Sequence, residues 1–107
     1  MNRTEHLIAC LAEECNEVAQ RATKALRFGL DEIQPEQNLT NFERLFAEFT
    51  DLTAVMGMLQ EETNHRALVK LNDVATKQEK VRKYMDYAES QGALQPSPSP
   101  GSQEKKP

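Results

Sequence analysis

The feature that most constrains the fold of this chain is a helical periodicity of apolar residues. Between residues 4 and 28, apolar side chains recur three or four positions apart, which places them on one face of an α-helix. Thr4 is a candidate N-cap, and Gly29 is a typical C-terminal stop. The residues of this face are Leu7, Ile8, Leu11, Cys15, Val18, Ala19, Ala22 and Leu26. We therefore predict one long amphipathic helix over residues 4–28.

A second helix is predicted over residues 40–62, where Thr40 and Glu43 have the spacing of a capping box. Pro35 and the polar run around it exclude a continuous helix through residues 29–39. The expected anchors of this connector are Leu30, Ile33 and Leu39. The apolar face of the second helix comprises Phe42, Leu45, Phe46, Phe49, Leu52, Thr53 and Met56, widened by Val55, Met58 and Leu59. This width predicts that the second helix is the most buried one.

A third helix is predicted from a cap at Asn72 or Asp73 to about Ser90, with Gly92 as its stop. Its apolar stripe consists of Val74, Val81, Tyr84, Met85 and Ala88. Residues 63–71 carry no clear pattern. The Pro/Ser-rich text of residues 93–107 is typical of a disordered tail, which leaves a helical domain at residues 1–92.

The sequence thus predicts an all-α fold, a helical bundle of about three main helices per chain. A domain of this size buries only ~60% of its chain surface and is marginal alone. We therefore expect oligomerisation to complete the bundle, as a homodimer or a homotetramer.

Charge and composition exclude several function classes. The net charge of -4 and the pI near 5.2 argue against a nucleic-acid polymer as partner, since such proteins are usually basic. No segment approaches the ~18 apolar residues of a membrane span, and no signal peptide is visible. Cys10 and Cys15 lack a CxxC spacing, so reduced thiols in the cytoplasm are expected.

Two acidic pairs lie beside the apolar faces of the first two helices: Glu14 with Glu17, and Glu48 with Asp51. Carboxylates three positions apart lie on neighbouring turns. If the two helices pack together, four carboxylates face a common point, which is the ligand set of Mg²⁺ or Mn²⁺. The alternative is that these are solvated surface glutamates, which are common on helices.

Two acidic segments follow each other along the chain: Glu13-Glu14-Cys15-Asn16-Glu17 and Glu48-Phe49-Thr50-Asp51. Together they resemble the EExxE…ExxD signature of the MazG-like all-α nucleoside triphosphate pyrophosphohydrolases. The flanking text at residues 12–19 and 24–29 is similar to that of the short bacteriophage and prophage members. The resemblance covers roughly residues 4–90. It implies Mg²⁺-dependent cleavage between the α- and β-phosphates of a nucleotide, giving a monophosphate and pyrophosphate.

By the same resemblance, Glu14, Glu17, Glu48 and Asp51 would hold the metal ions, and Glu13 would be a supporting or water-orienting carboxylate. Substrate phosphates could reach the basic residues Arg21 and Lys24, and the last helix would contribute Lys77 and Lys80. The alternative for each is a solvated surface cation.

Two further sets of residues carry weaker expectations. His6 and Cys10 are four apart on one helix, but with Glu14 they make a poor tetrahedral site. Tyr84 and Tyr87 are candidate contacts to a nucleotide base.

Two other functions stay open from the sequence. One is a protein of the same fold that binds or sequesters a nucleotide without hydrolysing it. The other is a helical interaction module whose acidic strip is solvated surface and whose behaviour does not depend on metal. The presence of all five carboxylates favours the enzyme.

Overall fold

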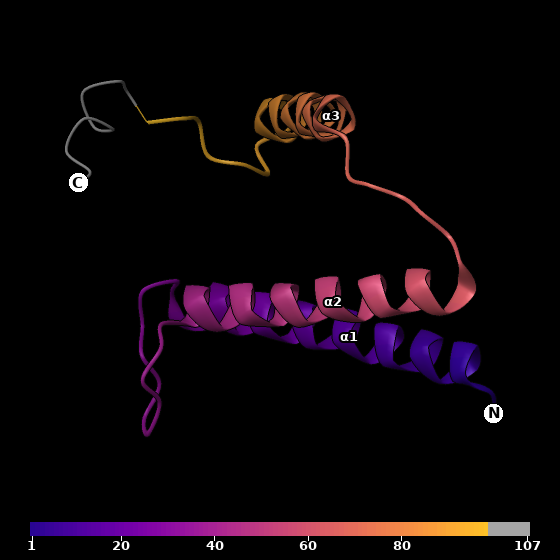
Figure 1. The fold of residues 1–107 in the computed structure, drawn as a ribbon. Helices are drawn as coiled ribbons and strands as arrows, with labels where there is room; N and C mark the ends of the chain where they lie inside the picture. Colours follow the sequence, from indigo (N-terminus) through magenta and orange to yellow (C-terminus); the bar gives the residue numbers. More distant parts are fainter. Residues whose placement is uncertain (99–107) are drawn as a thin grey trace. The chain divides into compact units, whose positions relative to one another are not determined.

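The computed structural model describes residues 1–98, which form three helices and no strand (Figure 1). They are α1 (Arg3–Phe28), α2 (Asn41–Thr63) and α3 (Leu71–Ser90), so the predicted all-α fold is confirmed. The chain divides into two compact units, one spanning Met1–Ala67 and one starting at Leu68. The predicted boundary at residue 92 stays a prediction, and residues 99–107 of the expected tail lie outside the described residues.

Local sequence accounts for the ends of α1. Its N-cap is Asn2, whose Oδ1 accepts from the Glu5 backbone N–H at 2.8 Å while the Asn2 N–H donates to Glu5 Oε1 at 2.9 Å. The expected cap at Thr4 was therefore wrong, because Asn2 forms a complete capping box two residues earlier. Gly29 ends the helix as predicted, with φ 99°, a backbone conformation that favours glycine.

The start of α2 follows the prediction and the start of α3 does not. Thr40 Oγ1 accepts from the Glu43 N–H at 3.0 Å, and the Thr40 N–H donates to Glu43 Oε1 at 2.9 Å. By contrast, α3 begins at Leu71 after Lys70, which makes no side-chain cap hydrogen bond. Asn72 and Asp73, the expected caps, lie within the first turn of α3 instead.

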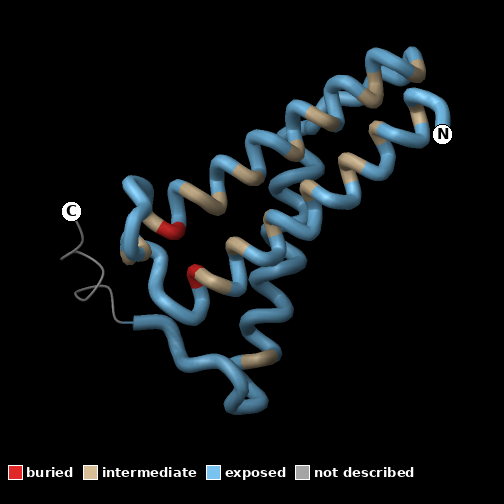
Figure 2. Tube along the Cα trace, turned by 90° about the horizontal axis from the view of Figure 1, so that it is seen from below, coloured by how far each residue is buried: buried red, intermediate tan, exposed pale blue. Residues whose placement is uncertain are grey.

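Helices α1 and α2 pack side by side as an antiparallel pair (Figure 1). Most of the more buried positions recur four and three residues apart, as in the seam of an antiparallel coiled coil, and they line the facing sides of the two helices (Figure 2). We call these positions the packed seam. It comprises Leu7, Leu11, Glu14, Val18, Arg21 and Ala25 from α1, and Asn41, Leu45, Glu48, Leu52, Val55 and Leu59 from α2.

The packed seam is narrower than the apolar faces that the sequence predicts. Ala25 is the one buried apolar residue among those described. Helices α1 and α2 each contain one buried residue, because a helix pair has a single contact surface and the wide apolar face of α2 extends past it. Several expected core residues are exposed: Ile8, Cys15, Ala19, Ala22, Leu26, Phe42, Phe46, Phe49, Thr53 and Met56.

The connector between α1 and α2 is held by polar contacts centred on Asn41. This side chain is only 3% exposed, and its Nδ2 donates to the Gly29 carbonyl at 2.8 Å and to Glu32 Oε1 at 3.0 Å. The expected apolar anchors, Leu30, Ile33 and Leu39, are each about half exposed. Asn41 therefore fixes the register in which α2 returns along α1.

In the second unit, α3 is an exposed amphipathic helix. None of its residues is buried, and Ala88 is its one half-buried residue. Arg82 and Glu79 form an exposed ion pair at 3.3 Å, of a kind that contributes little stability.

Candidate metal centre

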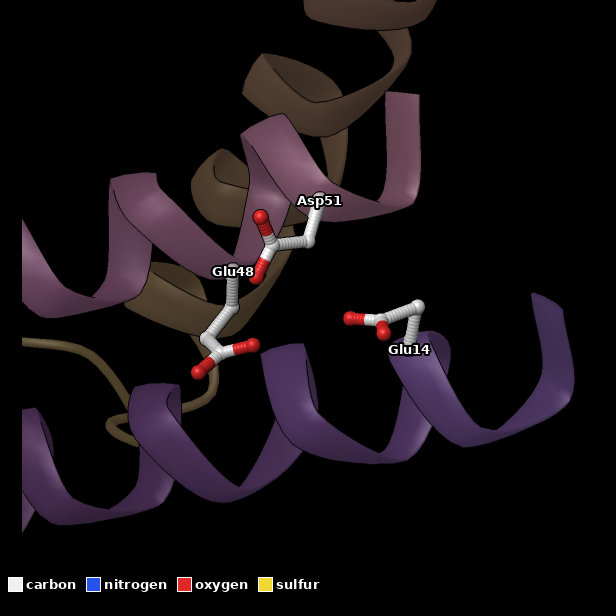
Figure 3. Close-up of side chains that lie close together, drawn as sticks. All are labelled: Glu14, Glu48 and Asp51. Carbon is white, nitrogen blue, oxygen red and sulfur yellow. The ribbon is translucent and has the colours of Figure 1, made fainter. Parts of the chain in front are cut away.

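Three carboxylates from α1 and α2 converge midway along the helix pair (Figure 3). Glu14, Glu48 and Asp51 each offer one oxygen, and these three oxygens lie within 4.8 Å of one another. Glu14 and Glu48 are half-buried positions of the packed seam, and Asp51 is exposed one turn after Glu48. The pairing of helices therefore creates the cluster, because neither helix alone supplies three ligands.

The electrostatics of Glu14 are unfavourable without a cation. Its Oε2 atom is buried and has no hydrogen-bond partner within the described residues. Burial raises the pKa of Glu14 above its ordinary value of 4.5, and the negative charges of Asp51, Glu48, Glu17 and Glu13 raise that pKa further. A divalent cation among these oxygens would lower the pKa of Glu14 again, since it gives the buried oxygen a coordination partner and places a positive charge beside the carboxylates.

The spacing of the oxygens suits a hard divalent ion. Mg²⁺–oxygen bonds of about 2.0–2.1 Å allow ligand oxygens to lie up to roughly 4.2 Å apart, and Ca²⁺–oxygen bonds of 2.3–2.6 Å allow roughly 5 Å. Oxygens within 4.8 Å of one another thus reach Mg²⁺ distances after small side-chain rotations. The all-carboxylate donor set favours Mg²⁺, Mn²⁺ or Ca²⁺ over softer ions.

Of the four carboxylates predicted to face a common point, the structure brings three together. Glu17 is exposed and is not a member of the converging set. Three residues correspond to about 300° around a helix, so Glu17 projects from the flank while Glu14 points across to α2. Glu13 is also exposed, and both side chains act on the centre through their charge.

The predicted basic residues are placed in three different settings. Arg21 lies in the packed seam two turns beyond Glu14, and its Nη1 atom is buried without a hydrogen-bond partner within residues 1–98. Lys24 is half buried at the edge of the same helix. Lys77 and Lys80 are exposed on α3, in the second unit, and their predicted role in substrate binding stays a prediction.

The remaining candidates do not join the centre. His6 and Cys10 belong to no group of potential metal ligands in the described part of the chain. Both cysteines are free thiols. Tyr84 and Tyr87 are 63% and 65% exposed on α3.

Asn41 is the positioning residue that sequence reasoning missed. It holds the connector in place two turns before Glu48, so it sets which residue of α2 faces Glu14. The available signal is weak: an asparagine directly after an N-cap is ordinary on a solvated helix, and its burial arises from the folded connector.

Comparison with known proteins adds no relative: no protein-family model, curated protein or solved structure matches this chain. Within residues 1–98, the helices are too polar or too short to cross a membrane.

Proposed function

We propose that this protein is a Mg²⁺-dependent nucleotide pyrophosphohydrolase, which cleaves a nucleoside triphosphate between its α- and β-phosphates. The observation that carries the proposal is the convergence of Glu14, Glu48 and Asp51, in which Glu14 has a buried Oε2 atom without a hydrogen-bond partner within the described residues. A carboxylate cluster of this kind is what the resemblance of the acidic motifs leads one to expect.

Glu14, Glu48 and Asp51 are the residues that would hold the metal, with Glu17 beside them on the flank of α1. When bound, Mg²⁺ supplies positive charge that neutralises phosphate oxygens and makes water more acidic. Mn²⁺ offers the same chemistry with similar ligands. Glu13, which is exposed and precedes Glu14 in the sequence, is a spare carboxylate that could orient a water molecule or accept its proton.

The position of Arg21 is a second argument for a phosphorylated substrate. It follows Glu14 by seven residues, which is two helical turns or about 10.5 Å along the axis, and lies on the same face of α1. Its buried Nη1 has no partner among the described residues, so a guanidinium donor is directed into the seam without an acceptor. A polyphosphate chain that starts at the metal and runs along α1 would provide that acceptor in a charge-assisted bond.

The balanced reaction consumes one water. Water attacks the α-phosphorus, the bond to the bridging oxygen breaks, and that oxygen leaves with pyrophosphate. The proton released from water passes to a nearby carboxylate and then to solvent. The products are a nucleoside monophosphate and pyrophosphate.

The test is a panel of nucleoside triphosphates incubated with the full chain and Mg²⁺, with pyrophosphate release as the readout. Glu48→Gln removes one ligand charge at constant size and should lower release at least about a hundredfold, the scale expected when a charge-stabilising group is lost. Glu61→Gln, the same substitution on the same helix but outside the cluster, is the matched control and should retain activity.

The other outcomes identify the alternatives. Nucleotide binding without pyrophosphate release would replace hydrolysis with sequestration. Equal behaviour of Glu48→Gln and wild type in both Mg²⁺ titration calorimetry and nucleotide binding would refute the metal centre. It would leave the acidic residues as solvated surface of an interaction module.

A further inference from the structure

Three basic residues lie on α1 and α2 next to the carboxylate cluster, and the third of them carries no motif in the sequence. Arg21 and Lys24 come from α1, and Arg44 comes from α2. All three are half buried, whereas arginine and lysine are mostly exposed unless they are paired. We call these three residues the basic cluster.

The packing that brings the carboxylates together also brings the two arginines together. Arg21 follows Glu14 by seven residues on α1. Arg44 precedes Asp51 by seven residues on α2. Seven residues are about 10.5 Å along a helix and return almost to the same face. Because the two helices are antiparallel (Figure 1), both steps lead in the same direction. Arg21 is therefore opposite Arg44 in the way that the two acidic residues are opposite each other, with oxygens within 4.8 Å.

No acidic side chain neutralises the basic cluster within residues 1–98. The one ion pair among these residues joins Arg82 and Glu79 of α3. Arg21 Nη1 is buried and has no hydrogen-bond partner there. The carboxylate of Glu32, in the connector, accepts from Asn41 instead. Like charges held together at half-buried positions repel each other, and a bound anion would relieve that repulsion.

The connector between α1 and α2 holds Arg44 in place. Arg44 Nη1 donates to Gln34 Oε1 at 3.1 Å in a part-buried hydrogen bond. Because Gln34 is uncharged, this bond orients the guanidinium without neutralising it. The other N–H groups of the guanidinium form a planar fork that matches two phosphate oxygens. Arg44 is therefore preorganised to bind a phosphate group, since less side-chain entropy is lost when it does so.

We propose that the basic cluster is an anion site for the phosphate group farthest from the metal, and that Arg44 makes the protein prefer nucleoside triphosphates over diphosphates. The anion site follows from the basic cluster alone, whereas its occupation by a nucleotide rests on the proposed function. The cluster lies about 10.5 Å along the helix pair from the carboxylates. The phosphate chain of a triphosphate extends one phosphate further toward it than that of a diphosphate, so Arg44 stabilises the triphosphate more.

The first test measures the anion site without metal or nucleotide. The isotope-labelled full chain is titrated with pyrophosphate in EDTA at low salt, and backbone amide shifts are followed by NMR. Saturable shifts are expected at the residues of the basic cluster. Arg44→Gln should weaken binding at least about tenfold, the scale of a hydrogen bond between charged groups. Arg27→Gln removes the same charge from an exposed position of the same unit, and should change the affinity by no more than about twofold because exposed charges are screened.

Three outcomes of this titration would overturn the anion site: shifts that do not saturate, shifts that lie only outside the basic cluster, and equal weakening by the two substitutions. If Arg44→Gln does not fold, Arg44→Lys takes its place. It keeps the charge but loses the bidentate fork, so it should weaken pyrophosphate binding several-fold. Unchanged binding by Arg44→Lys would overturn the proposal.

The second test separates this inference from the proposed function. With Mg²⁺, the ratio of kcat/KM for a nucleoside triphosphate to that for the diphosphate should fall at least about tenfold in Arg44→Gln and stay unchanged in Arg27→Gln. An equal loss for both nucleotides would overturn the role of Arg44 and leave the hydrolase intact. If neither nucleotide is hydrolysed, the proposed function fails, and the preference is measured as the ratio of the two dissociation constants by calorimetry. An unchanged ratio in Arg44→Gln would then overturn the inference as well.

Discussion

Replacing Asn41 with alanine tests whether polar contacts in the connector hold the helix pair in register. The substitution removes the two hydrogen bonds from Nδ2, at 2.8 Å to the Gly29 carbonyl and 3.0 Å to Glu32 Oε1. A neutral hydrogen bond contributes about 1 kcal/mol and one to a charged group about 1.5–3 kcal/mol. Because both contacts are only partly buried, we expect the free energy of unfolding to fall by about 2–3 kcal/mol.

The assay is urea denaturation followed by circular dichroism, with all proteins at one concentration so that any self-association affects them equally. For a domain of this size, such a loss corresponds to a midpoint of thermal unfolding lower by roughly 10–20 °C. Asn38→Ala is the control, since Asn38 is exposed in the same connector. If the two variants unfold within about 0.5 kcal/mol of each other, the noise of surface substitutions, Asn41 does not hold the register.

Three further predictions follow from the same residues and centre. Glu14→Gln should be more stable relative to metal-free wild type at pH 7 than at pH 4. The pKa of Glu14 is raised in the folded state, so the wild type loses stability as the pH rises from 4.5 through the folded-state pKa, and the variant does not. Denaturation in EDTA across this pH range measures the difference, and parallel pH profiles of the two proteins would contradict the prediction. Arg21→Gln should raise the KM for the nucleotide several-fold while Mg²⁺ affinity measured by calorimetry is unchanged, whereas loss of Mg²⁺ binding would contradict a phosphate contact. Thr40→Ala should lower the free energy of unfolding by about 1 kcal/mol by removing the N-cap, and Thr50→Ala, an exposed position within the same helix, should change it by much less.

Local signals in the sequence were sufficient for the helices of the first unit. The Thr40 and Glu43 capping box and the stop at Gly29 depend on residues within one turn of each other, and the structure shows both. The cap at Asn2 was missed although it is equally local, because Thr4 lies closer to the first apolar residue. Helix α3 begins at Leu71 after an N-cap, Lys70, that makes no side-chain hydrogen bond, so no sequence signal marked its start.

Packing between helices was harder to predict, because apolar periodicity identifies a face but does not show what covers it. Ile8 and Leu7 are adjacent and both apolar, yet Leu7 is half buried while Ile8 is 51% exposed. The structure separates them into two seams offset by one residue. The sequence alone merged these seams into one wide stripe, and it did not show which part of that stripe the partner helix of the same chain covers.

The candidate site was harder to predict for the same reason, because it depends on which residues the packing of α1 against α2 brings together. The sequence placed the acidic pairs beside the apolar faces, but Glu14 and Glu48 occupy positions of the packed seam itself, where an antiparallel helix pair would be more stable with leucine. Arg21 occupies another such position. Their buried atoms at Glu14 Oε2 and Arg21 Nη1 have opposite charges and, within the described residues, no partner. Two helical turns separate these residues, and no ion pair joins them within the described residues. A ligand with a cation at one end and an anion at the other would satisfy both groups, and the metal–polyphosphate complex that we propose as substrate has this arrangement.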